Sequence, residues 1–290
     1  MSGTVYLQPD TMEELASLLP TLPKKTAVLA GGTDLMIQIR DRHPDYSCLL
    51  SLWKIPQLRA VEEQDGWLKI GAMVTHAAAA RDPRVRRWFR GLSMACSHVG
   101  SQQIRNKGTL AGSLVNASPA GDIAPCAVLY GGEVELLGPG GIRRLTMDQF
   151  LHPDGRTDLQ PKEILTTIWL PIDQTLDSCF VKLGSRREVT IAQISLCAAW
   201  NTQDRQRTHL RAVVGAIDRR PCPFPQPQLL ADPAQADAAA QCLARQIQEI
   251  RLNRTRPSKL KLTPAEQLYK ERAARGVVFD LLDAMEAPDL

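Results

Sequence analysis

The sequence GTLAGSLVNASPAGD, at residues 108–122, lies between two well-patterned parts of the chain and differs from both. Small residues dominate it, and Pro119, Gly121 and Asp122 close it, so we expect the backbone to bend there and to approach another group closely. Few of its side chains are large enough to fill a core. Its composition fits both a plain surface loop and a loop that binds a ligand.

A second segment of the same kind near the N-terminus favours the ligand-binding interpretation. Residues 26–30, TAVLA, are typical of a short buried strand, and they lead directly into residues 31–34, GGTD. Helical spacing of apolar residues follows from Leu35. Glycines let backbone N–H groups converge and a helix N-terminus adds partial positive charge, so this unit predicts a site for phosphate or pyrophosphate. A tight strand-to-helix turn without a ligand fits the same residues, with Asp34 as an ordinary first-turn acid.

Length and charge limit the class of protein. A chain of 290 residues with 44% hydrophobic and 23% charged residues is globular, with roughly two domains or one large composite domain. The formal net charge is only +4, and the basic runs at residues 81–90 and 251–261 have no glycine–aromatic, helix-turn-helix or zinc pattern. We therefore expect no nucleic-acid partner, and interpret these runs as solvated faces or, second, as a surface that docks a partner protein.

Cysteine spacing and the N-terminus bear on the compartment. The seven cysteines are scattered singly, without a CxxC pair, which argues against an iron–sulfur cluster or a zinc site within the chain. They are typical of reduced, buried thiols in a cytoplasmic protein. The N-terminal residues have no basic region followed by an apolar one, and no run of about 18 apolar residues occurs, so we expect no signal peptide and no membrane span.

Local patterns in the first part of the chain predict an α/β lobe followed by helices. Thr11 is placed to cap a helix, with Glu14 completing a capping box, and Thr75 is placed to cap an alanine-rich helix. Residues 85–99 have the spacing of one amphipathic helix with four large side chains directed inward. These side chains are Trp88, Phe89, Leu92 and Cys96. The expected strands are residues 48–52, 58–61 and 67–71, the last two forming a hairpin.

From Ala124 onward strand patterns replace helices, and the chain then ends in helices. The expected strands are residues 133–137, 142–145, 163–170, 179–184, 194–200 and 209–216. The expected helices are residues 237–250 and 263–282, the second opened by a capping box with proline at its first position. The tail is therefore expected to be α+β, with a boundary near residue 173.

Four segments, in this order along the chain, resemble one known family. They are AGGTDLMIQIR at residues 30–40, QIRNKGTLAGSLVNASPAGD at residues 103–122, EILTTIWLP at residues 163–171 and FVKLGSRRE at residues 180–188. Together they resemble the FAD-binding (flavoprotein) subunit of molybdenum hydroxylases of the xanthine dehydrogenase type, to which the carbon monoxide dehydrogenase flavoprotein subunit is related. The resemblance extends to about residue 216.

The resemblance implies an α+β chain with a vanillyl-alcohol-oxidase/CO-dehydrogenase-type FAD-binding fold. An N-terminal α/β lobe and an antiparallel sheet lobe with helices would form an FAD-binding domain at residues 1–172, with subdomains of about residues 1–56 and 57–172. A C-terminal α+β domain, residues 173–290, would contain a three-stranded sheet with helices.

The resemblance also implies where FAD binds. A first loop, residues 29–35, and a second loop, residues 108–122, would grip the pyrophosphate and ribityl chain from two sides. Leu165 would meet the flavin, and Lys182 would lie near its ring, where a cation favours the anionic reduced state. Carried over residue by residue, the FAD-binding positions are Leu29, Ala30, Gly31, Gly32, Thr33, Asp34, Leu35, Val99, Gly108, Thr109, Gly112, Ser113, Asn116, Asp122, Leu165 and Lys182. The first loop has no histidine, so we predict non-covalent FAD.

The sequence departs from the family in its second motif and in its C-terminal third, where GAIDRRPCP at residues 215–223 is unlike the family, and some residues keep simpler interpretations. The second motif usually contains TIGGN, whereas Ala111 and Ser113 replace a glycine and the asparagine here, and an alanine fits such a position only where φ is negative. Lys182 also fits a solvent-facing lysine, and Asp122 fits a turn residue. Arg186 and Arg187 fit either surface charges or anchors of a loop near the flavin.

The resemblance implies an oxidoreductase component: the FAD-binding subunit of a multi-subunit, xanthine dehydrogenase-like molybdenum hydroxylase of the cytoplasm. Substrate would be oxidised at a molybdenum cofactor on one partner subunit, electrons would pass through [2Fe-2S] centres on another, and FAD would pass them to NAD+. We assign no catalytic acid–base residue and no metal ligand to this chain. Two alternatives remain: a stand-alone flavin oxidoreductase of the same fold, and a nucleotide-binding assembly subunit without a redox role.

Overall fold

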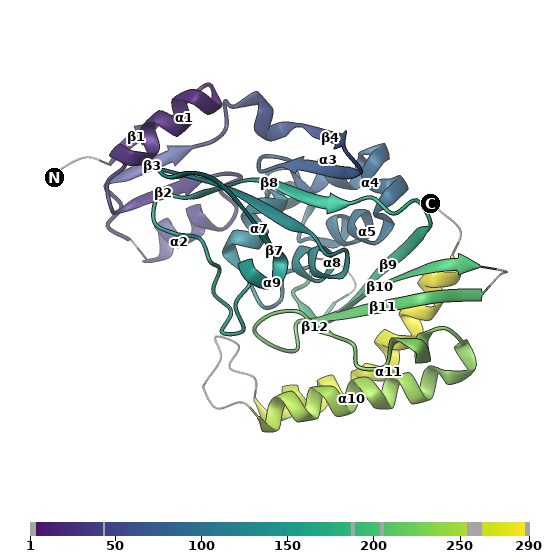
Figure 1. The fold of residues 1–290 in the computed structure, drawn as a ribbon. Coiled ribbons are helices and arrows are strands. Elements are labelled where there is room, and N and C mark those ends of the chain that lie inside the picture. Colours follow the sequence, from purple (N-terminus) through teal and green to yellow (C-terminus); the bar gives the residue numbers. More distant parts are fainter. Residues whose placement is uncertain (1–3, 43, 187–188, 204–205, 254–262, 288–290) are drawn as a thin grey trace.

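The computed structural model describes residues 4–42, 44–186, 189–203, 206–253 and 263–287. Its strands form three sheets, and helices pack on them around two hydrophobic cores (Figure 1). This is the mixed helix-and-sheet architecture that the family resemblance implies.

The N-terminal lobe is built on a parallel sheet with the strand order β1-β3-β2. Its elements are β1 (Val5–Leu7), α1 (Met12–Leu18), the 3-10 turn η1 (Leu19–Thr21), β2 (Thr26–Leu29), α2 (Leu35–Arg42) and β3 (Cys48–Ser51). Thr11 caps α1 as predicted, because its hydroxyl accepts a hydrogen bond from the N–H of Glu14 at 3.1 Å. The predicted capping box is wrong, since the Glu14 carboxylate accepts from the N–H of Asp10 instead. The strand predicted at residues 26–30 is present as β2, but the expectation that it is buried is wrong, because β2 lies at a sheet edge and only Ala27 in it is buried.

The second lobe contains an antiparallel sheet with the strand order β4-β5-β8-β6-β7. Its strands are β4 (Val61–Gln64), β5 (Trp67–Gly71), β6 (Glu133–Gly138), β7 (Gly141–Thr146) and β8 (Ile164–Pro171). Its helices are the 3-10 turn η2 (Pro56–Arg59), α3 (His76–Arg81), α4 (Pro83–Trp88), α5 (Arg90–His98), α6 (Gln102–Arg105), α7 (Leu110–Asn116), α8 (Ile123–Leu129) and α9 (Met147–Phe150). Thr75 caps α3 as predicted, accepting from the N–H of Ala78 at 3.1 Å.

Several local predictions for this lobe are wrong. The helix expected at residues 85–99 is broken at Phe89, whose φ of −139° and ψ of 55° separate α4 from α5, and the side chain of Trp88 is only half-buried. Leu58 belongs to η2 rather than to a strand. The loop expected at residues 108–122 contains α7, and α8 occupies the residues after Ala124 where strands were expected.

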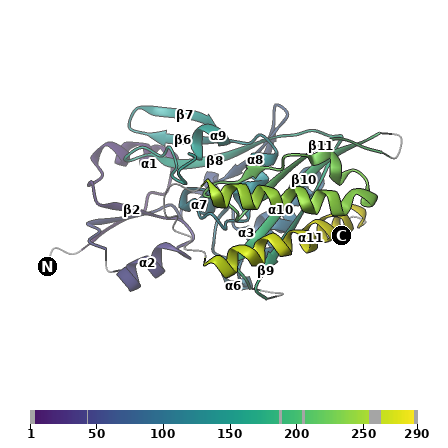
Figure 2. The same ribbon diagram turned by 90° about the horizontal axis from the view of Figure 1, so that it is seen from below.

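The C-terminal part is an antiparallel sheet with the order β12-β11-β10-β9, covered on one face by α10 and α11 (Figure 2). Its elements are β9 (Leu176–Gly184), β10 (Ala192–Gln203), β11 (Gln206–Gly215), β12 (Cys222–Pro223), the 3-10 turns η3 (Pro227–Leu230) and η4 (Pro233–Gln235), α10 (Ala236–Leu252) and α11 (Pro264–Glu286). The two-residue β12 adds a fourth strand to the three that were expected. The basic run at residues 251–261 lies largely outside the described residues, as do side chains of the cap expected at 263–266.

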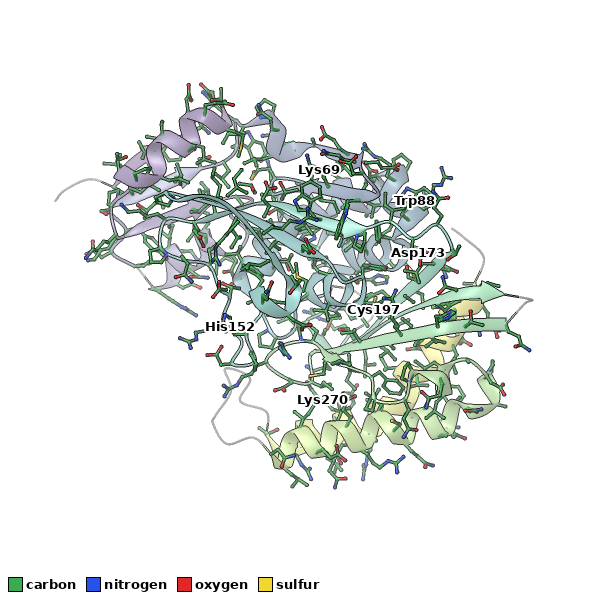
Figure 3. All side chains as sticks on the ribbon, viewed as in Figure 1. Lys69, Trp88, His152, Asp173, Cys197 and Lys270 are labelled. Carbon is green, nitrogen blue, oxygen red and sulfur yellow. The ribbon has the colours of Figure 1, made fainter. Side chains whose placement is uncertain are left out.

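The cores lie on opposite faces of the C-terminal sheet. One core includes Phe180 and Cys197 with the helices and sheets of the first two lobes, and the other includes Trp200 with α10 and α11. Cys197 therefore lies near the middle of the molecule (Figure 3), with its Sγ 3.4 Å from the Sγ of Cys126. All seven cysteines are free thiols, and all but Cys222 are buried. Within the described ranges, no helix is both long and apolar enough to cross a membrane.

Candidate functional site

The first and second loops meet, and glycines make the contact possible. A Cβ built on Gly31 would lie 2.0 Å from the carbonyl oxygen of Lys107 and 2.9 Å from the Cα of Gly108. A Cβ built on Gly108 would lie 3.2 Å from the hydroxyl of Thr33. Real Cβ atoms do not approach a backbone oxygen to 2.0 Å, so the junction requires glycine at position 31, whereas a Cβ at position 108 would be tightly packed and would need its neighbours to shift.

The first loop presents unpaired donors. Gly32 has a φ of +72°, a conformation that glycine adopts without strain, and it turns the chain from β2 into α2. Within the described part of the chain, none of the four backbone N–H groups of residues 31–34 has a hydrogen-bond acceptor. Four unpaired N–H groups ahead of a helix N-terminus favour a ligand rich in anionic oxygen.

Backbone hydrogen bonds fix the second loop to the segment between β5 and α3 and to the first residue of α3. The N–H of His76 donates to the carbonyl of Gly108 at 3.0 Å, and the N–H of Leu110 donates to the carbonyl of Val74 at 3.2 Å. Thr109 is buried, and its hydroxyl caps α7 by accepting from the N–H of Gly112 at 3.0 Å. These bonds hold α7 in one place beside the first loop.

The replacement of the usual glycine by alanine is accommodated. Ala111 lies in α7, where φ is negative, and its side chain is buried in the core. Among the described residues, the side chains of Thr33, Ser113 and Asn116 form no hydrogen bond within the protein. Polar side chains without internal partners are available to a ligand.

A buried ion pair lies beyond the C-terminal end of α7. Lys182 Nζ is 2.6 Å from Asp122 Oδ2, and the side chains of the two residues are only 4% and 5% exposed. Lys182 also donates to the carbonyl of His98 at 3.0 Å, which ties β9 to the end of α5. Burial raises the pKa of Asp122, and the nearby ammonium of Lys182 opposes that rise.

One carboxylate oxygen of Asp122 takes no part in this ion pair. Asp122 Oδ1 is fully enclosed and has no hydrogen-bond partner in the described part of the molecule. A buried, unpaired carboxylate oxygen costs free energy unless a ligand donates to it. The hydroxyl of Ser113 lies 3.7 Å from the position of a Cβ on Gly121, the residue that precedes Asp122.

The remaining predicted positions divide between the site and the core. Val99 directly follows His98, and Leu165 is buried in the core on β8. The end of β2 and the start of α2 supply Leu29, Ala30 and Leu35, all partly exposed around the first loop. The carboxylate of Asp34 accepts a hydrogen bond from the side chain of Gln38, a local contact within α2 and its first turn.

The structure excludes the simpler interpretations of Lys182 and Asp122. Lys182 is not a solvent-facing lysine, because it is buried in an ion pair, and Asp122 is not an ordinary turn residue for the same reason. Arg186 is exposed, and Arg187 lies outside the described residues. His76 lies at the junction of the two loops, buried against Gly108, and sequence reasoning did not single it out, because its distance from the glycine loops in sequence gave no signal.

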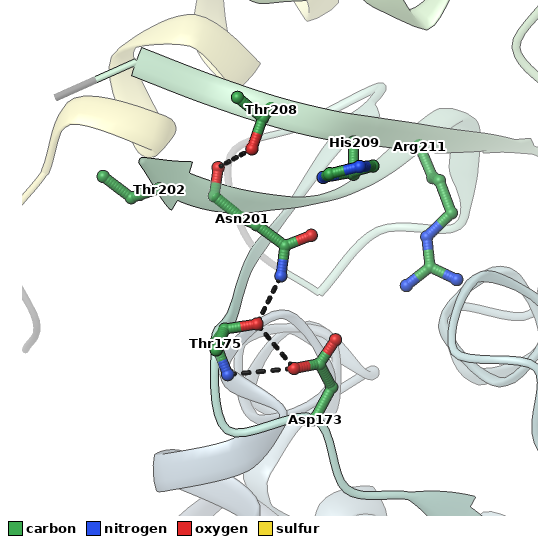
Figure 4. Close-up of a pocket in the computed structure, with 7 residues that line it drawn as sticks. All are labelled: Asp173, Thr175, Asn201, Thr202, Thr208, His209 and Arg211. Atoms are coloured by element: carbon green, nitrogen blue, oxygen red, sulfur yellow. Dashed lines mark hydrogen bonds between the residues drawn. The ribbon is translucent and has the colours of Figure 1, made fainter. Parts of the chain in front are cut away.

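A hollow lies elsewhere, at the opposite end of β9 from Lys182. Figure 4 shows the residues that line it. It is lined by Asp173, Thr175, Asn201, Thr202, Thr208, His209 and Arg211. On one side, Thr175 donates to Asp173 at 2.7 Å and accepts from Asn201 at 2.6 Å, so these polar groups are already paired. None of the predicted FAD-binding residues lines this hollow.

The chain is similar to known proteins along its whole length. Residues 2–173 match the model of a family described as the FAD binding domain in molybdopterin dehydrogenase. The chain is 30% identical over 299 aligned residues to the nicotinate dehydrogenase FAD-subunit of Eubacterium barkeri, covering 99% of this chain and 98% of that one. It is 26% identical to a putative xanthine dehydrogenase FAD-binding subunit of Escherichia coli over 74% of this chain and 75% of that one.

A solved structure shares the fold. Quinoline 2-oxidoreductase from Pseudomonas putida 86 contains a chain that superposes with a TM-score of 0.83, covering 97% of each chain at 24% identity. At this identity the likeness establishes the fold alone.

Proposed function

Because this chain belongs to the family of FAD-binding domains of molybdopterin dehydrogenases, we propose that it holds FAD between its first and second loops and passes electrons to NAD+. It is an FAD-binding oxidoreductase component of a molybdenum hydroxylase-type complex. The residues present fit FAD, because the cofactor is long and has a group for each part of the site: the first loop has unpaired N–H groups and contacts Gly108, before α7, and Asp122, after α7, has a buried carboxylate oxygen without a partner.

The four unpaired N–H groups of residues 31–34 are the observation on which the proposed site depends. We assign them to the pyrophosphate, since backbone N–H groups at a helix start bind phosphate without a fixed cation. Ser113, Asn116 and Asp122 are assigned to the ribityl hydroxyls, because hydroxyl groups can both donate to a carboxylate and accept from a side chain. Val99, Leu165 and Lys182 are assigned to the flavin end.

FAD, when bound, supplies the conversion between one-electron carriers and a two-electron acceptor. The chain supplies position and charge: Lys182 holds a positive charge at the buried end of the site, and Asp122 balances it. We assign the source of electrons to [2Fe-2S] centres on one partner subunit and the oxidation of substrate to a molybdenum cofactor on another, as in a xanthine dehydrogenase-like complex. The free cysteines support a reducing compartment, and we place the complex in the cytoplasm.

The absorption spectrum of the purified chain tests the flavin assignment. We expect flavin bands that leave the protein on denaturation, because the FAD is proposed to be non-covalent. A colourless chain that takes up no added FAD would contradict the proposal and favour an assembly subunit without a redox role.

Anaerobic reduction tests the acceptor separately. We expect NADH to bleach the bound flavin, since electron transfer to NAD+ is reversible in principle. Bleaching by dithionite but not by NADH would reject NAD+ as the partner while leaving FAD binding intact.

A further inference from the structure

His76 is a buried polar side chain without a partner. It is 3% exposed, and in the described part of the protein neither nitrogen of its ring forms a hydrogen bond. Its Nδ1 is fully enclosed. Buried imidazoles normally form hydrogen bonds, so an unpaired one beside a ligand site points to a bond that the ligand completes.

The imidazole edge faces the junction of the two loops. The Cδ2 atom of His76 and the hydroxyl oxygen of Thr33 each lie 3.2 Å from the position of a Cβ on Gly108. Since Nε2 is bonded to Cδ2, it belongs to the same edge of the ring. The ring therefore adds a nitrogen to the place where the first loop, with its unpaired N–H groups, contacts the second.

The neutral charge state of the His76 ring makes Nε2 a hydrogen-bond donor. Burial lowers the pKa of His76 to about 4, and the nearby positive charge of Arg105 acts in the same direction, so the ring is neutral at neutral pH. A neutral imidazole has one N–H. Nδ1 is enclosed and has no partner, and a buried N–H without an acceptor is rarer than a buried acceptor without a donor. We therefore place the proton on Nε2 and the lone pair on Nδ1.

We propose that His76 donates a hydrogen bond from Nε2 to a phosphate oxygen of the FAD pyrophosphate. This rests on the proposed function, and it adds a residue from outside both loops to the site. The groups around the junction, which are four N–H groups, the Thr33 hydroxyl and this N–H, are all able to donate, and pyrophosphate oxygens are acceptors only.

Three variants test the proposal, with FAD binding to the apoprotein followed by flavin fluorescence. His76→Leu removes the donor at similar volume, and we expect the Kd for FAD to rise about 10- to 100-fold, as for one hydrogen bond to a charged group. His76→Gln places an amide N–H near the Nε2 position, and we expect it to bind FAD within about threefold of the wild type. His209→Asn, on β11 and outside the proposed site, keeps the left-handed backbone of that residue and controls for the loss of a histidine.

A second readout separates binding from a structural role. Because His76→Leu removes an unpaired buried nitrogen, we expect the melting temperature of the apoprotein to stay the same or to rise while FAD binding weakens. The loss should also appear with ADP as the probe and be absent with riboflavin, which has no phosphate. A lower melting temperature with unchanged affinity for FAD would overturn the proposal, as would a loss confined to riboflavin. Failure of the wild type to bind FAD would overturn the proposed function as well, whereas equal binding by wild type and His76→Leu would overturn only the role of His76.

Discussion

Gly31 is the residue at which the two loops depend most directly on the absence of a side chain. We expect Gly31→Ala to weaken FAD binding by at least about 10-fold and to lower the free energy of unfolding by about 1–3 kcal/mol, since its Cβ would overlap the Lys107 carbonyl. Titration with FAD and urea unfolding measure the two effects. Gly140→Ala is the matched control, because a Cβ there meets nothing within 4 Å. Equal effects of both variants would contradict the proposed junction.

The Asp122–Lys182 pair makes a prediction about pH. Replacing Lys182 with methionine leaves a buried carboxylate without its cation, which raises the pKa of Asp122 further. A carboxyl whose pKa is raised by folding destabilises the folded state above that raised pKa, and the penalty disappears as the pH falls below its ordinary pKa. We expect Lys182→Met to lose about 3–5 kcal/mol of stability at neutral pH, and the deficit to shrink in acid, as measured by urea unfolding at several pH values.

A double variant provides the control for the pair. Removing both charges in Asp122→Asn with Lys182→Met leaves no unpaired buried ion, so we expect it to be more stable than Lys182→Met alone at neutral pH. If the double variant were less stable than the single one, or the deficit did not change with pH, the ion pair would not have the role assigned here.

Sequence reasoning predicted the residues of the proposed site but not their contacts. The motifs identified the two loops, Asp122 and Lys182, because glycines and small polar residues in a fixed order are visible in a single chain. They could not show that Asp122 and Lys182 pair with each other, since the contact joins residues on different elements. His76 gave no signal, because its burial depends on the packing of α3 against the second loop.

Helix α7 shows how tertiary contacts override local propensity. Glycine, serine and asparagine disfavour helix, which made a loop the natural expectation for residues 110–116. The helix forms because Thr109 caps it and because Leu110 and Leu114 are buried in the core. The break at Phe89 could not be predicted for a similar reason. The spacing of apolar residues continues across Phe89, but the backbone there is not helical.

The role of the Thr109 cap of α7 in FAD binding can be tested by comparison with the Thr11 cap of α1. We expect Thr109→Ala to cost about 1 kcal/mol of stability and to weaken FAD binding, because α7 positions Ser113 and Asn116. Thr11→Ala removes the equivalent cap of α1 and should cost a similar amount while leaving FAD binding unchanged. Urea unfolding and FAD titration of both variants, with Thr109→Ser as the conservative change, measure this. Equal FAD affinities in Thr109→Ala and Thr11→Ala would show that α7 does not position ligand-binding groups.

At the scale of the whole molecule, we propose a domain boundary between residues 172 and 173, with a subdivision of the first domain near residue 56. The second hydrophobic core supports the main boundary, since all of its buried residues lie within residues 173–290, although the first core also takes Phe180 and Cys197 from that domain. The domains nevertheless share a packed interface, because α5 and α8 cover one face of the C-terminal sheet. Lys182 reaches Asp122 across that interface, so the C-terminal domain contributes directly to the proposed FAD site.

Arg90 joins three elements at this interface. Its guanidinium donates to the carbonyls of Ser178 and Ala284 and pairs with Asp177 at 3.2 Å. We expect Arg90→Met to lower the free energy of unfolding by about 2–3 kcal/mol because these part-buried acceptors lose a charged donor, with little change in FAD affinity. Arg87→Met, an exposed neighbour stacked on Trp88, should cost less than about 1 kcal/mol. Similar losses in the two variants, measured by urea unfolding, would contradict a role for Arg90 in domain docking.

Hydrogen exchange of the first-loop amides, measured with and without FAD, tests whether the N–H groups of residues 31–34 bind the cofactor. The N–H groups of residues 31–34 have no acceptor in the described protein, so we expect them to exchange rapidly in the apoprotein and to become protected when FAD binds. Binding of FAD with protection elsewhere, and with residues 31–34 still exchanging rapidly, would contradict the account.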